Sequence, residues 1–268
     1  MGRIFIMGDL HGLATNFTSR IKWYIQDPQE DDIIICAGDV GLEYGNQIQG
    51  SLKKAMKKFP GTIYVIRGNH DNRYWRNHTD VIETYTDYIE KSNDGWAFDN
   101  DTFPTLLYQK KYPNILYVKD GGGVYTINGY RFLFIPGAYS VDKDYRLSRG
   151  YPYEPEEQLT WLEENQLLSA IEYCNTPEET ALNSLRIDYV VSHTAPLGTQ
   201  PYYKDLFLNF VDQSTVDKHM EYFLDEVYNL LDNNFKHWYF GHFHDDRTFG
   251  KFTMLYTKIQ EIGEVNEG

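Results

Sequence analysis

Short runs of apolar residues recur along the chain, and helical patterns separate them. Apolar runs that lack polar alternation predict strands buried on both faces. The five strongest runs occupy residues 3–7, 33–37, 62–66, 188–192 and 236–240. Amphipathic stretches predict helices that begin near residue 15 and cover residues 52–59, 155–171 and 215–231. Strands that alternate with helices indicate an α/β protein.

The middle of the chain follows a different pattern. Aromatic residues lie among Asp, Asn, Gly and Pro from residue 84 to 114, which predicts an irregular insertion there. Short strands are expected at residues 115–118, 124–127 and 131–135, with hairpin turns at Gly121–Gly123 and Asn128–Gly129. They suggest a second, antiparallel-rich sheet, and a last strand is expected over 252–259. No repeat or linker divides the chain, so we predict a single domain over residues 1–268.

Composition narrows the partners and the compartment. The formal net charge is -14, which argues against nucleic acid or an anionic membrane as the default partner, although bound divalent cations can reverse the local field. Cys36 and Cys174 are the only cysteines, so we expect no disulfide framework and a cytoplasmic location. No apolar run reaches membrane-spanning length, and nothing in the sequence indicates the oligomeric state.

Side chains with metal-binding chemistry follow each of the five strong strands. A single Gly-Asp pair most often begins a helix, but five such strand ends together indicate a metal site. Seven candidate ligands exceed the needs of one tetrahedral ion and suit two ions that share a carboxylate. Their oxygen and imidazole donors favour Mn²⁺, Fe²⁺, Zn²⁺ or Co²⁺ over Mg²⁺ alone. The candidates are Asp9, His11, Asp39, Asn69, His193, His242 and His244. An extended backbone at 9–11 and 242–244 would point both side chains of each pair to the same face.

The five blocks occur in an order that resembles the calcineurin-like metallophosphoesterase superfamily, over nearly the whole chain. The similarity is greatest to a branch of small bacterial and phage-type metallophosphoesterases of unassigned substrate. The blocks are Gly8-Asp9-Leu10-His11, Gly38-Asp39, Gly68-Asn69-His70-Asp71, Ser192-His193 and Gly241-His242-Phe243-His244. The resemblance implies a four-layer α-β-β-α sandwich with two mixed central sheets. It also implies that Asp39 bridges two ions, with Mn²⁺ favoured. The ligands of the first ion would be Asp9, His11 and His244, and those of the second Asn69, His193 and His242.

The chemistry implied by the resemblance is hydrolysis of a phosphomonoester or phosphodiester by a metal-bridging hydroxide. His70 would act as the general acid, and Asp71 would orient its imidazole. Asp71 could alternatively cap a following helix. Two other functions stay open: a non-catalytic metal-binding scaffold for protein interaction, and a nuclease of the same superfamily. The complete ligand set disfavours the first, and the acidic charge disfavours the second.

The substrate side of the site is less defined by sequence. Lys143 and Arg146 are the best candidates for contacts with a substrate phosphate, and salt bridges with nearby acidic residues are the alternative. Arg67 is expected to point away from the ligands, because side chains alternate along a strand. Val40-Gly41 replaces the Asp-Arg-Gly of related protein Ser/Thr phosphatases, which makes a phosphoprotein less expected as substrate. A small phosphate ester or another phosphorylated substrate is the expected partner.

Overall fold

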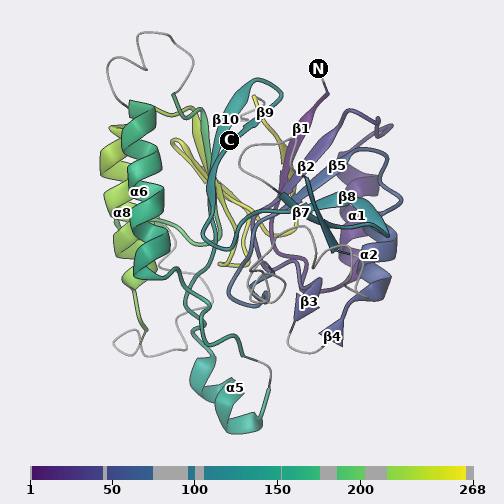
Figure 1. Ribbon diagram of the computed structural model, residues 1–268, viewed down its shortest axis with the longest axis horizontal. Helices are drawn as coiled ribbons and strands as arrows, with labels where there is room; N and C mark the ends of the chain where they lie inside the picture. The colour runs from purple at the N-terminus through teal and green to yellow at the C-terminus, as the bar shows by residue number, and fades with distance from the viewer. Residues whose placement is uncertain are drawn as a thin grey trace.

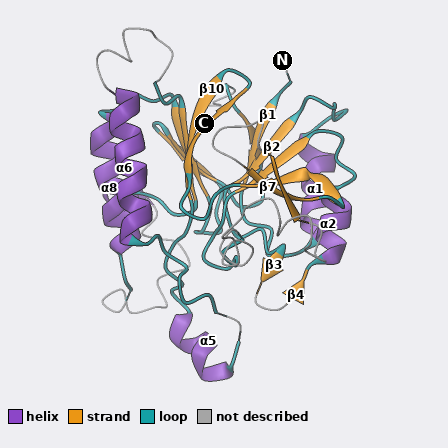
Figure 2. Ribbon diagram, in the orientation of Figure 1, coloured by secondary structure: helices purple, strands orange, loops and turns teal. Residues whose placement is uncertain are grey.

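The computed structural model describes residues 2–44, 47–74, 96–99, 106–151, 153–175, 186–202 and 216–263. Two β-sheets lie face to face between two layers of helices (Figure 1). Figure 2 shows α6 and α8 outside one sheet and α1 and α2 outside the other. The predicted four-layer α-β-β-α arrangement with two mixed sheets is therefore confirmed. The helices are α1 (Ala14–Tyr24), α2 (Gly50–Met56), α5 (Lys143–Arg149), α6 (Trp161–Asn175) and α8 (His219–Leu231), and a 3-10 helix η1 covers Leu197–Tyr202.

The first sheet has seven strands in the order β15-β1-β2-β5-β8-β7-β6. Its central strands β1, β2, β5 and β8 are parallel neighbours. In this register Met7 lies beside Cys36, which lies beside Val65, so three strands end at the same edge of the sheet. The strands are β15 (Ile259–Glu261), β1 (Ile4–Met7), β2 (Ile33–Cys36), β5 (Thr62–Val65), β8 (Tyr112–Tyr117), β7 (Leu106–Gln109) and β6 (Trp96–Asp99).

The second sheet has six strands in the order β13-β14-β12-β11-β10-β9. Strands β10, β11 and β12 are parallel, and Ile135, Ser192 and Phe240 are neighbours at their carboxyl ends. The strands are β13 (Arg247–Phe249), β14 (Phe252–Met254), β12 (His237–Phe240), β11 (Tyr189–Ser192), β10 (Tyr130–Ile135) and β9 (Gly123–Ile127). A separate two-stranded ribbon pairs β3 (Glu43–Tyr44) with β4 (Gln47–Ile48).

Three apolar clusters hold these layers together. Side chains from the inner faces of both sheets form the central one, in which Ile6 and Ile35 pack with Val191 and Tyr239. The other two lie between each sheet and its own helices. Strands β1, β2, β11 and β12 are buried along their whole length, which explains why their sequences show apolar runs rather than alternation. Among the described helices, none has the length and apolar character needed to cross a membrane.

Two predicted helix starts were wrong. The helix expected from residue 155 begins at Trp161, because an irregular segment before it docks against the first sheet. Arg67 Nη1 donates to the carbonyl oxygen of Glu157, while Arg73 donates to those of Glu156 and Gln158. The helix expected from residue 215 begins at His219, and residue 215 itself lies outside the described residues. Tertiary contacts thus override the local pattern at the first of these starts.

The two glycine turns had different outcomes. Asn128 and Gly129 both have positive φ (49° and 79°) and join β9 to β10 as the predicted hairpin. The hairpin predicted at Gly121–Gly123 is wrong, because β8 and β9 belong to different sheets and this segment crosses between them. Gly122 has φ 75°, and a Cβ there would overlap the carbonyl oxygen of Phe134, so only glycine fits the crossing.

Two further expectations need revision where the structure describes them. Strands β6 and β7 extend the first sheet by antiparallel pairing, so part of the stretch expected to be irregular is regular. Residues 84–95 and 100–105 of that stretch lie outside the described residues. The single strand expected over 252–259 is two strands, β14 and β15, which lie in different sheets. The segment between them carries Tyr256 to the candidate site.

Glu221 on α8 provides a test of buried charge. Its carboxyl group is buried near the Thr194 hydroxyl, and burial raises the pKa of Glu221 to about 7. The folded chain therefore retains a proton that the unfolded chain loses near pH 4.5, and the contribution of this group to the free energy of unfolding falls as pH rises through 7. We expect Glu221→Gln to raise stability at pH 8 by on the order of 2 kcal/mol, or a few degrees in Tm, but not at pH 4.

Thermal unfolding of the wild type and Glu221→Gln between pH 4 and pH 8 measures this difference. Glu172→Gln, an exposed position on α6, is the matched control and should leave the unfolding curve unchanged. Parallel stability curves for the wild type and Glu221→Gln would contradict the expected titration.

Candidate metal centre

The carboxyl ends of five strands from two sheets meet at one place. Strands β1, β2 and β5 deliver Asp9, Asp39 and Asn69, and strands β11 and β12 deliver His193 and His242. Backbone amides in these loops donate hydrogen bonds that join the strand ends of one sheet to each other and to those of the other sheet. The amides of Leu10 and His11 donate to the Asp39 carbonyl oxygen, and the His242 amide donates to Asp9 Oδ1 at 3.1 Å. The structure therefore brings all seven predicted metal ligands into one constellation.

Glycines in the motifs let the ligands approach the backbone closely. A Cβ at Gly68 would overlap the Asp39 carboxylate, and a Cβ at Gly241 would overlap the Asp9 carboxylate. Each carboxylate thus lies against the glycine of a neighbouring strand end. Any larger residue at these positions would push a ligand out of place.

The ligand-bearing backbone is itself unusual. His11, Asp39, His242 and His244 all have left-handed φ angles, of 49°, 48°, 69° and 53°. The extended backbone expected at 9–11 and 242–244 is therefore wrong, because these residues lie in tight turns. A non-glycine residue in this conformation costs on the order of 1–3 kcal/mol and typically marks a functional site.

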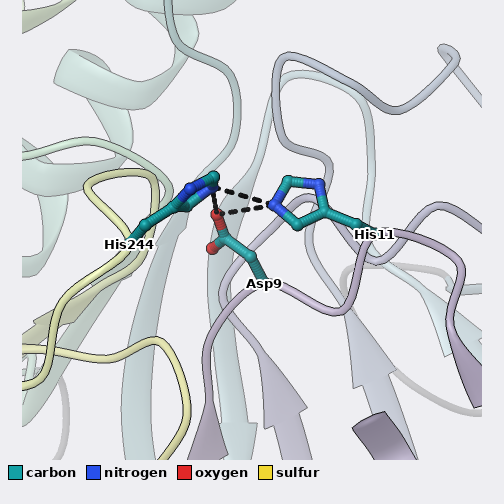
Figure 3. A group of neighbouring side chains, drawn as sticks. All are labelled: Asp9, His11 and His244. Carbon is teal, nitrogen blue, oxygen red and sulfur yellow. Dashed lines mark hydrogen bonds and ion pairs between the residues drawn. The ribbon is translucent and has the colours of Figure 1, made fainter. Parts of the chain in front are cut away.

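Asp9, His11 and His244 form the more exposed part of the constellation (Figure 3). His11 Nε2 and His244 Nε2 lie 2.8 Å apart, and Asp9 Oδ2 lies 3.7 Å from the first and 3.3 Å from the second. Asp9 Oδ2 is buried and accepts no hydrogen bond from the described residues. Three ligand atoms that lie within 4.8 Å of one another, one of them a buried carboxylate oxygen without a hydrogen-bond donor, fit a divalent cation.

Residues outside the candidate ligand set support this group. Tyr256 stacks on the His244 ring, with centroids 4.6 Å apart and an interplanar angle of 18°. Asp246 accepts hydrogen bonds from the backbone amides of Tyr256 and Thr257, which fixes the loop that carries the ring. Asp246 is thus a support for the site rather than a free turn residue. Buried Arg20 donates to the carbonyl oxygens of Gly8 and Asp9 and so holds the backbone of the Gly8–His11 block in place.

Asn69, His193 and His242 form the buried part of the constellation. Asn69 Oδ1 lies 2.8 Å from His193 Nε2 and 3.1 Å from His242 Nδ1. His193 Nδ1 lies 2.8 Å from the Ala37 carbonyl oxygen and can only donate to it. This contact leaves His193 Nε2 facing the site, as metal-ligating histidines require.

Asp39 lies between the two groups. Its Oδ1 is 3.4 Å from His193 Nε2 and accepts a hydrogen bond from the His70 amide at 2.8 Å. Burial opposes ionisation of Asp39, but His193 and His70 outweigh it, so the pKa of Asp39 is well below its usual range. Asp9 has a lowered pKa as well, since His244 and His193 outweigh its burial. Both carboxylates are therefore ionised at neutral pH.

The field of these carboxylates attracts positive charge. Burial opposes protonation of His193, but Asp39 and Asp9 outweigh it and raise the pKa of His193 to about 9. His242 responds in the opposite way, because burial and the neighbouring His193 lower its pKa to about 3. An environment that stabilises a buried imidazolium would also stabilise a metal cation at the same donors. The residues present therefore fit a divalent metal centre.

His70 lies at the open side of the constellation. Its side chain is 19% exposed, its Nε2 lies 3.9 Å from Asp39 Oδ2, and its ring centroid lies 6.0 Å from that of His11. Burial and the nearby Arg146 lower the pKa of His70, although Asp39 opposes them. Because the His70 side chain is partly exposed and lies beside His11, its imidazole can reach a molecule that binds over the exposed edges of His11 and His244.

Asp71 binds backbone amides that adjoin the candidate ligands. Its carboxylate accepts hydrogen bonds from the amides of Val40, Gly41 and Gly68, at 3.2, 2.7 and 2.9 Å. These contacts hold the Gly38-Asp39 block against the Gly68–Asp71 block and support a structural role for Asp71. Its predicted orientation of the His70 imidazole stays a prediction.

The basic residues take three different positions. Lys143 Nζ lies 5.6 Å from the Tyr139 ring centroid and 5.1 Å from that of Tyr153. Arg146 Nε donates to Asp142 Oδ2 at 2.7 Å, the salt bridge considered as the alternative to phosphate binding. Arg67 is buried away from the ligands, as alternation predicted.

The remaining histidines have other partners. His219 Nε2 lies 2.6 Å from Glu164 Oε1, and His237 Nε2 lies 2.7 Å from the Thr253 hydroxyl. Both histidines therefore lie outside the candidate metal centre. His78 lies outside the described residues.

Comparison with protein families agrees with this geometry. The family model described as calcineurin-like phosphoesterase matches residues 2–246, nearly the whole chain. The chain belongs to this family, whose members are generally divalent-metal-dependent hydrolases of phosphate esters. A comparison with curated protein sequences gives no match.

Proposed function

We propose that the protein is a dinuclear metal-dependent phosphoesterase that hydrolyses a phosphomonoester or a phosphodiester. The observation that carries the proposal is the convergence of metal-competent donors in two groups about Asp39, beside an accessible imidazole. In this proposal Asp39 contacts both ions, and Mn²⁺ is the favoured metal. The first ion is held by Asp9, His11 and His244, and the second by Asn69, His193 and His242.

When bound, the two ions would supply Lewis-acid stabilisation of the phosphate oxygens and make water a stronger nucleophile at neutral pH. The chain's own residues do the rest. The exposed edges of His11, His244 and His70 mark the side from which the substrate enters. His70 acts as the acid at the departing oxygen, a role typically worth roughly 10²–10⁴-fold in rate.

The substrate in this proposal is a small phosphate ester or another phosphorylated molecule. Arg146 is near enough to His70 to lower the pKa of its imidazole, which supports a contact between Arg146 and the substrate phosphate. Lys143 is the second basic residue proposed for this contact, on the sequence pattern alone. A nucleic acid is the less favoured substrate, because the net charge is -14. We place the protein in the cytoplasm, because both cysteines are free and buried.

Hydrolysis of p-nitrophenyl phosphate and bis-p-nitrophenyl phosphate, with and without added Mn²⁺, tests the proposal. We expect Mn²⁺-dependent release of p-nitrophenol from at least one ester, and the ratio between the two shows whether monoesters or diesters are preferred. A metal-loaded protein that hydrolyses neither ester nor a labelled oligonucleotide, yet binds a protein partner stably, would be a scaffold. Cleavage of the oligonucleotide alone would indicate a nuclease.

A further inference from the structure

The carboxamide of Asn69 is the only proposed ligand whose two ends differ in what they can offer a cation. Its Oδ1 can bind a metal, whereas its Nδ2 carries two protons and cannot. The amide group rotates easily about its terminal bond, so something must hold Oδ1 toward the site. In the structure Oδ1 faces His193 and His242, and Nδ2 faces the opposite way.

Ser140 provides the contact on the Nδ2 side. Asn69 Nδ2 donates to the Ser140 hydroxyl oxygen at 2.8 Å, and both residues are buried. This contact selects one orientation of the amide, since a flipped Asn69 would present an acceptor to Ser140 and two N–H groups to the histidines. Ser140 follows β10 in the second sheet, so the contact also joins the Gly68–Asp71 block, which follows β5 of the first sheet, to the second sheet.

Glu157 in turn holds Ser140. Its Oε1 accepts a hydrogen bond from the Ser140 amide at 2.9 Å, and its side chain is buried. Burial raises the pKa of Glu157 to about 7, while the Ser140 hydroxyl and amide favour its ionised form. The contacts thus run in series: the Glu157 carboxylate accepts from the Ser140 backbone amide, and the Ser140 hydroxyl oxygen accepts from the Asn69 carboxamide.

The segment that carries Glu157 is itself bound to residues that flank the Gly68–Asp71 block. Arg67 precedes this block and Arg73 follows it, and their guanidinium groups donate to the carbonyl oxygens of residues 156–158. Arg73 also forms two hydrogen bonds with the Glu163 carboxylate, at 2.6 and 3.1 Å. The loop before α6 is thus held by hydrogen bonds to the residues on both sides of the Gly68–Asp71 block.

We propose that Ser140 and Glu157 are positioning residues that hold the Asn69 carboxamide with Oδ1 toward the second metal ion. This inference rests on the proposed function, because it assigns Asn69 to a metal site. Neither residue touches the metal or the substrate; they act through Asn69. Loss of such outer contacts typically lowers metal affinity by 10–100-fold.

The test compares Mn²⁺ binding by wild type, Ser140→Ala and Glu157→Gln, with free Mn²⁺ counted by electron paramagnetic resonance. We expect the wild type to bind two ions. In Ser140→Ala the dissociation constant of one ion should rise by about 10–100-fold, while that of the other stays unchanged. Glu157→Gln keeps the side-chain shape but loses the charge, so a smaller rise at the same ion is expected. Ser148→Ala, which removes an exposed hydroxyl on α5, is the matched control.

Activity gives a second readout that general destabilisation would not produce. The Mn²⁺ concentration for half-maximal ester hydrolysis should rise in Ser140→Ala, while kcat at saturating Mn²⁺ returns to within a few-fold of the wild type. Equal weakening of both ions, or unchanged affinity in both variants, would overturn the inference while leaving the proposed function intact. Unchanged binding in Glu157→Gln alone would remove Glu157 from it. A wild type that binds no Mn²⁺ would instead refute the proposed function.

If Ser140→Ala does not fold, as judged by circular dichroism, Glu157→Gln carries the test alone. A selective rise at one ion would then support the inference, and unchanged or equally weakened binding of both ions would overturn it.

Discussion

Asp39→Asn is expected to abolish phosphoester hydrolysis and to release at least one of two bound ions. Asp39 is the proposed ligand common to both ions, and the substitution replaces an anionic carboxylate by a neutral amide with one oxygen. We expect a loss of roughly 10³-fold or more in kcat/KM, equivalent to about 4 kcal/mol of transition-state stabilisation. The measurement is ester hydrolysis together with metal counting on the same sample.

The chain offers a close control for this variant. Asp27 has a left-handed φ of 47°, almost the same as the 48° of Asp39, but it is exposed and distant in sequence from the motifs. Asparagine tolerates this conformation as well as aspartate does, so neither variant adds backbone strain. Asp27→Asn should therefore keep full activity and both ions. Undiminished activity in Asp39→Asn would refute the bridging assignment.

His70→Ala should slow hydrolysis without removing metal. The imidazole lies beside Asp39 on the open side of the site and is not one of the proposed ligands. A general acid is typically worth roughly 10²–10⁴-fold in rate, so kcat should fall by that factor while two ions stay bound. The loss should be greater for alkyl phosphates than for p-nitrophenyl esters, because a poor leaving group depends more on protonation.

A histidine outside the site is the control for His70→Ala. His219 pairs with Glu164 on the helical side of the second sheet, so His219→Ala should leave kcat unchanged. If His70→Ala kept full activity toward both classes of ester, His70 would have no part in catalysis. If it lost metal as well, His70 would contribute to the metal site rather than to the leaving group.

The convergence of the candidate ligands was predictable because it depends on a simple property of parallel sheets. Each buried strand is an apolar run in the sequence, and each run ends where its functional side chain begins. Since parallel strands end at a common edge, Asp9, Asp39 and Asn69 had to be neighbours once their strands were recognised. The same holds for His193 and His242 in the second sheet.

The supports of the site were not predictable in the same way. Ser140 lies 71 residues from Asn69 in the sequence, and Glu157 lies 17 residues beyond Ser140, with no periodic pattern to connect them. The 155–160 segment resembles the start of a helix, and only Arg67 and Arg73 show why it is irregular. Such residues are recognised by tertiary hydrogen bonds, which a local pattern does not encode.

Backbone conformation at the ligands also escaped sequence reasoning. Alternation along a strand predicted paired side chains at 242–244, but both histidines lie in left-handed turns. As a result His242 faces Asn69 while His244 faces Asp9, so the two serve different groups. Asp71 shows the same limit, because its acidic side chain next to His70 binds backbone amides of two motifs.

In the proposed function, hydrolysis of a phosphate ester requires two ions at this centre. The most direct test of this requirement is a titration of the metal-free protein with Mn²⁺, in which bound ions and the hydrolysis of p-nitrophenyl phosphate and its bis ester are measured on the same sample. Activity should rise with occupancy and saturate when two ions are bound per chain. Saturation of both sites without hydrolysis of either ester would contradict it.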